Sequence, residues 1–236
     1  MPEHATDDQS FGIGVGAVFA AGLRGFVAHP GPLMVAGAAT LGAYLAFRYP
    51  ARRAFEDGDV LRSILVDLAG MILASVVATV WYSYALQADR GNGVDITRPF
   101  RHVRLFGVQA VASFWFWAGL LLGLRYLYGL PSIVALLFYS LYGFVVADLA
   151  PPSGLKALGT SVKLGQGRRL GLLAFAALFI VFNLTGAIAL GLDTGPAGMV
   201  LAFLGVNVTA SVTLVSGARI YRVLSGSAQM GAAADA

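Results

Sequence analysis

The sequence predicts an all-α polytopic membrane protein with six transmembrane helices and short amphipathic helices at the membrane surface. Of its 236 residues, 58% are hydrophobic and only 12% are charged, whereas a soluble domain carries about 25% charged residues. The apolar residues form six stretches that are long enough, or nearly so, to cross roughly 30 Å of hydrocarbon. Basic residues cluster in the segments between these stretches, which is typical of multi-pass membrane proteins.

The predicted spans are, in chain order, 33–49, 61–86, 105–128, 132–149, 170–192 and 197–224. Proline destabilises a helix interior and is tolerated at a helix start. Prolines stand next to several of the predicted boundaries, including Pro50 after the first span and Pro131 before the fourth. No long polar linker divides the chain. We therefore expect one transmembrane domain over 11–224, between a polar N-terminal tail (1–10) and a flexible C-terminal tail (225–236).

Three further segments, 10–29, 95–104 and 152–169, are too polar to span the membrane and precede the first, third and fifth spans. With six spans, all three lie on the same membrane face as both termini. This regularity predicts three units, each made of a surface segment followed by a helical hairpin.

The first surface segment has a face of small residues, which predicts close packing against another helix. That face consists of Gly14, Ala17, Ala21 and Ala28, with Arg24 as its lone charge. The pattern is compatible with a helix at the membrane surface and with a re-entrant element.

The third surface segment is amphipathic. On a helical wheel Leu155, Leu158 and Val162 share one side, and Lys156 and Lys163 share the opposite side. This pattern predicts a helix that lies in the headgroup layer with its leucines in the acyl boundary.

The charge distribution predicts the orientation. Eleven of the 16 basic residues lie on the face that carries the termini, and five lie on the other face. By the positive-inside rule, this excess places both termini in the cytoplasm and predicts a multi-pass protein of the inner (plasma) membrane.

The chain offers little catalytic or metal-binding chemistry. It has no cysteine, and its three histidines, His4, His29 and His102, show no metal-ligand spacing. No serine–histidine–aspartate set or pair of carboxylates converges at one depth. We therefore expect a non-catalytic protein with no cofactor, no metal site and no nucleic-acid partner.

Polar and aromatic residues inside the spans have ordinary structural interpretations. Gln109, Ser113, Asn183 and Asn207 predict interhelical hydrogen bonds. The run Phe114-Trp115-Phe116-Trp117 predicts packing or lipid-facing aromatics rather than a quinone or pigment site, because consecutive side chains point around a helix.

Two groups of charged residues are candidates for function. Anionic lipid headgroups attract basic residues near the membrane surface, and the candidates for this role are Lys156, Lys163, Arg168, Arg169, Arg98, Arg101 and Arg104. Asp67 lies within the second span, where a carboxylate is a candidate for transport. The first group predicts a scaffold or accessory subunit of a membrane complex, or an organiser of anionic lipid. The alternative is a transporter or the permease subunit of an export system. The expected partners are membrane lipids, and either another membrane protein or a second copy of this chain.

Several stretches resemble one group of membrane proteins. They are Gly22-Leu-Arg-Gly-Phe-Val-Ala-His-Pro-Gly-Pro-Leu33, the run from Leu130-Pro131-Ser132 through Ala147-Asp148 to 154–170, and Asn183-Leu-Thr-Gly186. They resemble YciC-like membrane proteins and the membrane domain attached to some glycerophosphodiester phosphodiesterases. The resemblance implies a six-helix bundle with interfacial helices. It assigns no catalytic residue, because these families have no agreed molecular function.

The predicted orientation can be tested with single cysteines in this cysteine-free chain. Cysteines at Gly58 and Thr194 should react with an impermeant reagent added to intact cells, and a cysteine at Ser227 should not. The reverse labelling pattern would overturn the orientation.

Overall fold

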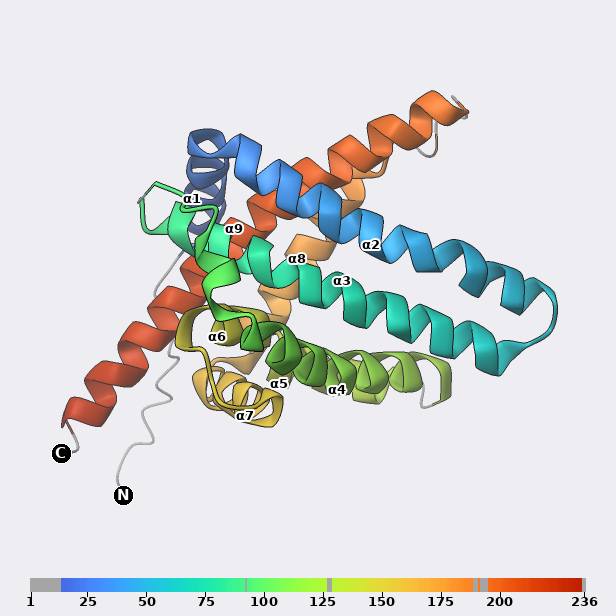
Figure 1. Ribbon diagram of the computed structural model, residues 1–236. Helices are drawn as coiled ribbons and strands as arrows, with labels where there is room; N and C mark the ends of the chain where they lie inside the picture. The colour runs from blue at the N-terminus through green and yellow to red at the C-terminus, as the bar shows by residue number, and fades with distance from the viewer. Residues whose placement is uncertain (1–13, 92, 127–128, 189–190, 192–194, 235–236) are drawn as a thin grey trace, which may run out of the picture.

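The computed structural model describes residues 14–91, 93–126, 129–188, 191 and 195–234 (Figure 1). Every regular element in these residues is helical. Six helical segments of the described chain are long and apolar enough to cross a membrane, which confirms the predicted fold class. The predicted N-terminal tail lies outside the described residues.

The elements follow one another with short connections. In chain order they are α1 (Val15–Ala28), α2 (Pro30–Glu56), α3 (Val60–Asp89), the 3-10 helix η1 (Arg98–His102), α4 (Arg104–Tyr126), α5 (Leu130–Tyr139), α6 (Tyr142–Leu149), α7 (Gly154–Leu164), α8 (Arg169–Gly186) and α9 (Pro196–Ala234). The six spans are α2, α3, α4, α5 with α6, α8 and α9. The last helix, α9, continues through Ala234 into the stretch predicted to be a flexible tail.

The spans form a closed ring. Each one contacts the next, in the order α2, α3, α4, α5, α8 and α9, and α9 returns to α2. The short elements α1, η1 and α7 lie at the end of the ring where α9 finishes, which we call the surface-helix end (Figure 1). The opposite end, with the α2–α3 turn and the start of α9, is the hairpin end. Each of the three hairpins is thus preceded by a short helix at one common end, as the three-unit pattern predicts.

Two spans differ from their predicted form. The first does not end at Pro50, because α2 continues through this proline to Glu56. Ala51 and Ala54 beyond the proline are buried, and this tertiary packing offsets the cost of an interior proline. The fourth span is broken at Ser140, where α5 ends and α6 begins. The break directs α6 toward α3, which it contacts.

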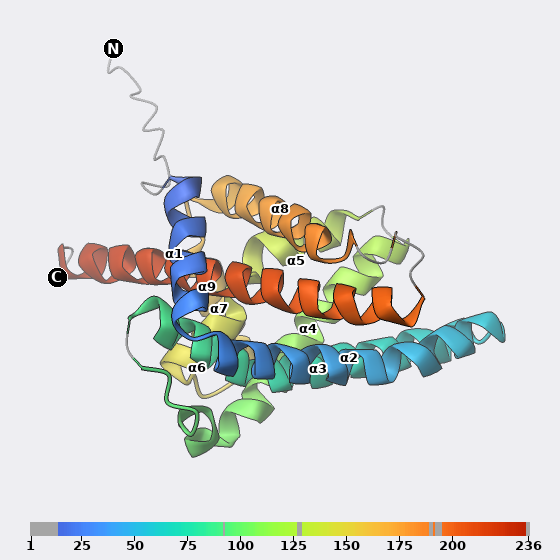
Figure 2. The same cartoon turned by 90° about the horizontal axis from the view of Figure 1, so that it is seen from above.

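The first helix crosses the long helices and packs against α9 (Figure 2). The prediction of close packing was right about the type of contact but wrong about the face. The buried residues of α1 are Val18, Gly22 and Gly25, whereas Gly14, Ala17 and Ala28 are exposed. A Cβ atom at Gly22 would collide with the Ser216 side chain. Glycine is therefore required where the two helices cross.

The α7 helix packs more deeply into the protein than its wheel pattern predicts. Leu158 is buried among side chains of α4, α5 and α6 rather than in the acyl boundary, whereas Leu155 is exposed. A Cβ at Gly154 would lie 2.7 Å from the Val108 carbonyl oxygen, so this glycine permits the approach of α7 to α4. Lys156 and Lys163 remain exposed, as predicted.

Candidate functional site

A cavity of about 630 Å³ lies inside the ring of spans. Every span contributes to its lining, which includes Thr40 and Tyr44 from α2, Ser75, Trp81 and Tyr82 from α3, Phe116 and Trp117 from α4, Leu136 from α5, Tyr142 and Phe144 from α6, Phe175, Phe179 and Asn183 from α8, and Thr213 and Gly217 from α9. No charged side chain is among the lining residues that the structure describes. The cavity is therefore an uncharged, mainly apolar space with nine aromatic side chains in its lining.

Aromatic rings from α3, α6 and α8 form much of its wall. The Tyr82 and Phe144 rings meet edge to face with their centroids 4.9 Å apart. On α8, Phe175 and Phe179 lie one turn apart, with centroids separated by 6.1 Å. A Cβ at Gly217 of α9 would lie only 3.0 Å from Phe144, so the large ring on α6 faces a glycine.

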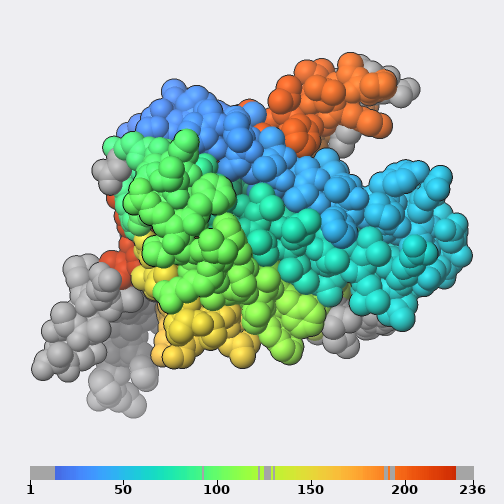
Figure 3. Space-filling view, in the orientation of Figure 1, coloured from blue at the N-terminus to red at the C-terminus, as the bar shows by residue number. Residues whose placement is uncertain are grey.

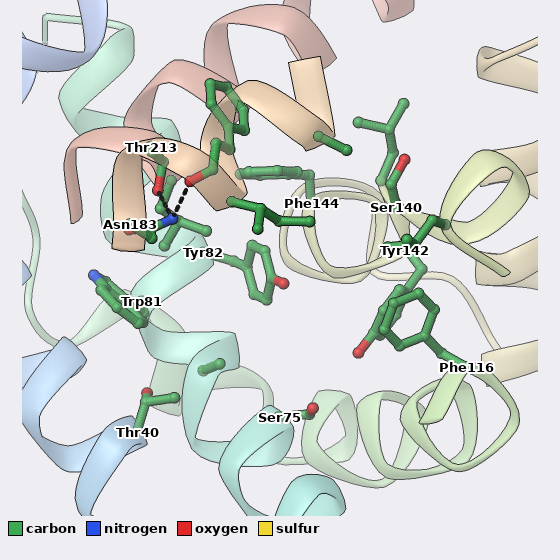
Figure 4. Close-up of a pocket in the computed structure, with 18 of the residues that line it drawn as sticks. Thr40, Ser75, Trp81, Tyr82, Phe116, Ser140, Tyr142, Phe144, Asn183 and Thr213 are labelled. Carbon is green, nitrogen blue, oxygen red and sulfur yellow. Dashed lines mark hydrogen bonds between the residues drawn. The ribbon is translucent and has the colours of Figure 1, made fainter. Parts of the chain in front are cut away.

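One corner of the cavity carries neutral hydroxyl groups (Figure 4). The Trp117 indole N–H donates to the Ser75 hydroxyl over 2.8 Å. The Ser113 and Tyr142 hydroxyls lie 3.2 Å apart and share a hydrogen bond. The Tyr82 hydroxyl points into the cavity from α3 (Figure 4). We call Ser75, Tyr82 and Tyr142, which line the cavity, and Ser113, which bonds to Tyr142 without lining it, the hydroxyl corner.

The side of the cavity formed by α8 and α9 has one amide. The Asn183 Nδ2 donates to the Phe179 carbonyl over 2.8 Å and to the Thr213 hydroxyl over 3.2 Å. This is the interhelical bond predicted for Asn183. Asn207 likewise bonds across helices, to the Met34 carbonyl of α2 over 2.9 Å.

An ion pair and a hydrogen bond join three spans at the surface-helix end. Arg90 at the end of α3 contacts Asp148 of α6 at 2.5 Å. The second oxygen of Asp148 accepts a hydrogen bond from the Tyr221 hydroxyl of α9 over 3.2 Å. The Tyr221 ring stacks on Phe144, with centroids 5.8 Å apart, and Phe144 itself lines the cavity. These contacts close the ring at this end.

The ring is wider at the hairpin end. The start of α9 stands apart from the α2–α3 hairpin, and the surface is hollowed between them (Figure 3).

The predicted lipid-binding residues gather at the surface-helix end, and none of them lines the cavity. Lys156, Lys163, Arg98 and Arg104 are exposed there. Arg168 and Arg169 lie where α8 begins, and the Arg169 guanidinium lies 4.1 Å from the centre of the Phe138 ring.

Arg101 is already engaged within the protein. Its guanidinium pairs with Asp95 at 3.1 Å. Hydrogen bonds from the Thr97 hydroxyl and backbone N–H lower the pKa of the Asp95 carboxyl. The carboxylate therefore stays charged and available to Arg101.

Asp67, the candidate for transport, is not among the residues that line the cavity. It pairs with Arg48 of α2 at 3.0 Å near the hairpin end. Asp148 is at the opposite end of the bundle and is paired as well. The structure does not bring these two carboxylates together.

The aromatic run in the third span divides as its spacing predicts. Phe116 and Trp117 line the cavity, whereas Phe114 and Trp115 are exposed on the outside of the bundle. Tyr82, Tyr142 and Ser75 were not singled out from the sequence. Their positions in separate spans give no local pattern, because only the ring arrangement brings them together.

No protein-family model, curated protein or solved structure matches this chain. The resemblance to YciC-like proteins and to phosphodiesterase membrane domains therefore stays a prediction.

The Arg90–Asp148 ion pair at the surface-helix end should contribute more to the free energy of unfolding than the Arg48–Asp67 pair near the hairpin end. Asp148→Asn removes the charge that compensates Arg90, and both side chains are mostly buried, so we expect a loss of about 1–3 kcal/mol in the free energy of unfolding. Asp67→Asn is the matched control. Its partner Arg48 is half exposed, so we expect this substitution to lower the free energy of unfolding by only about 0–1 kcal/mol. Denaturant unfolding in mild detergent measures both, and equal losses would contradict the assignment.

Proposed function

We propose that the protein is a non-catalytic lipid-binding membrane protein whose central cavity receives an uncharged, mainly apolar molecule from the bilayer. The observation that carries this proposal is the cavity lined by all six spans, with many aromatic side chains and no charged lining residue among those described. A charged ligand would lose its hydration there without gaining a partner of opposite charge, which is costly.

The size and composition of the cavity support a small lipid-like occupant. Ligand sites are typically concave, mostly apolar spaces of about 300–1,000 Å³ with a few placed polar groups. At about 630 Å³, with a few hydroxyls and one amide among aromatic rings, the cavity has these properties. We propose that the ligand enters through the gap between the start of α9 and the α2–α3 hairpin (Figure 3).

The lining also supports a binding role rather than catalysis. General acid–base catalysis needs side chains that exchange protons near neutral pH, such as histidine or a carboxylate with a raised pKa. The described lining residues offer aromatic, aliphatic, hydroxyl and amide groups. Such groups select and orient a ligand, and they do not by themselves activate it.

Anionic lipid at the surface-helix end forms a second part of the proposal. Lys156 and Lys163 are both exposed on α7, which is docked on the bundle by Leu158. Each basic residue near an anionic surface contributes about 1 kcal/mol of attraction. With the termini in the cytoplasm, these residues face the cytoplasmic leaflet, where anionic lipids are concentrated.

A permease is the second candidate, and the broken fourth span favours it. Discontinuous spans line the substrate sites of many transporters, and here Ser140, at the break between α5 and α6, lines the cavity. An uncharged substrate would fit the same lining. Net movement of a cavity ligand across proteoliposomes would favour the permease, whereas binding without movement favours the lipid-binding protein.

Filling the cavity should block binding. Ala176→Phe places a ring in the cavity from α8, whereas Ala177→Phe places the same ring on the exposed face of that helix. The chain has three tryptophans, and Trp115→Phe leaves Trp81 and Trp117, which both line the cavity. In this background, methyl dibromostearate should quench tryptophan fluorescence. We expect Ala176→Phe to weaken quenching about tenfold or more, and Ala177→Phe to match the parent. Equal quenching in both variants would contradict a ligand in the cavity.

The basic surface can be tested by lipid retention. Lys156→Gln with Lys163→Gln removes two exposed charges at the surface-helix end. The purified protein should then retain less anionic lipid by mass spectrometry, with an affinity lower by about 30-fold. Arg52→Gln with Arg53→Gln removes two exposed charges at the hairpin end and is the control. Equal lipid retention by both double variants would mean that the α7 lysines set the topology and do not bind anionic lipid.

A further inference from the structure

The Tyr82 hydroxyl is a polar group directed at the open space of the cavity (Figure 4). The other members of the hydroxyl corner have partners, since Ser75 accepts from Trp117 and Tyr142 bonds with Ser113. The hydrogen bonds described in this corner run from Trp117 to Ser75 and between Ser113 and Tyr142, and neither includes the Tyr82 hydroxyl. A hydroxyl without a hydrogen-bond partner in an apolar site costs free energy. The site therefore favours a ligand that forms a hydrogen bond with this hydroxyl.

Two neighbours on α6 hold the Tyr82 ring in place. A Cβ at position 143 would collide with the ring, so Gly143 is the residue that admits it. Phe144 packs against it edge to face at 4.9 Å. The ring is therefore held before a ligand arrives, and a hydrogen bond from its hydroxyl requires little further loss of side-chain entropy.

The surroundings define which ligand groups fit this hydroxyl. The hydroxyl corner holds neutral donors and acceptors, and no cation lines the cavity among the described residues. A carboxylate or phosphate would lack a counter-charge there. A pure hydrocarbon would leave the tyrosine hydroxyl unpaired. A carbonyl or ester oxygen suits this site, because it accepts a hydrogen bond from the tyrosine hydroxyl and carries no charge.

We propose that the cavity selects uncharged lipids that carry a carbonyl or ester oxygen, and that the Tyr82 hydroxyl donates a hydrogen bond to this oxygen. This inference rests on the proposed function, since it requires that a ligand enters the cavity. It adds the chemical class of that ligand and a specificity-determining residue. The apolar body of the ligand then lies along Phe144, Phe175 and Phe179.

Two brominated probes that differ in one polar group test the inference. They are methyl dibromostearate, which has an ester, and dibromooctadecane, a hydrocarbon of similar length. Quenching of Trp81 and Trp117 reports binding of each probe to the full chain carrying Trp115→Phe. The parent should bind the ester about 3–10-fold more tightly than the hydrocarbon, as one neutral hydrogen bond allows. Tyr82→Phe should abolish this preference and leave hydrocarbon binding unchanged or stronger.

Tyr84→Phe is the matched control on the same helix. The Tyr84 hydroxyl donates to the Ile96 carbonyl over 2.9 Å and does not line the cavity, so its removal should leave the ester preference intact. A parent without ester preference, or a Tyr82→Phe variant that keeps it, would overturn the inference while the proposed function stands. If Ala176→Phe fails to reduce quenching by either probe, the proposed function itself fails.

Discussion

The ion pair between Arg90 and Asp148 holds the broken fourth span across the end of the ring. A carboxylate at the edge of the membrane needs a partner, and Asp148 has two, because Tyr221 occupies its second oxygen. This arrangement ties α6 to α3 and α9. With α6 held there, Phe144 meets both Tyr82 and Tyr221, and the cavity ends within the bundle. The packing of the spans at the surface-helix end thus depends on the paired charge of Asp148.

Small residues determine where the spans touch and where space remains. In lipid, apolar surface gives little driving force for helix association, so close backbone contact and interhelical hydrogen bonds hold the bundle. Gly186 of α8 and Gly205 of α9 meet backbone to backbone. Gly143 and Gly217 instead face the rings of Tyr82 and Phe144. The large aromatic side chains project toward the centre of the bundle and hold the spans apart. The cavity is the space that remains between them.

Charge is separated from the cavity along the bundle axis. The basic side chains of α7 and η1 lie at the surface-helix end, and Arg48 with Asp67 lies near the hairpin end. Between them the lining is neutral. A molecule of this kind can attract anionic headgroups at one membrane face by long-range electrostatics and still select uncharged lipid inside by shape and single hydrogen bonds. The proposed lipid binding would account for both the basic surface and the neutral cavity.

The sequence alone determined the all-helical class, the six spans and the grouping of short helices at one end, because hydropathy and charge act over each segment independently of its neighbours. Interhelical bonds of Asn183 and Asn207 also followed from polar groups inside apolar stretches. Only the tertiary structure decided that α2 continues through Pro50 and that the fourth span breaks at Ser140. It alone brought Tyr82, Ser75 and Tyr142 to one corner, since residues from different spans meet only when the ring closes.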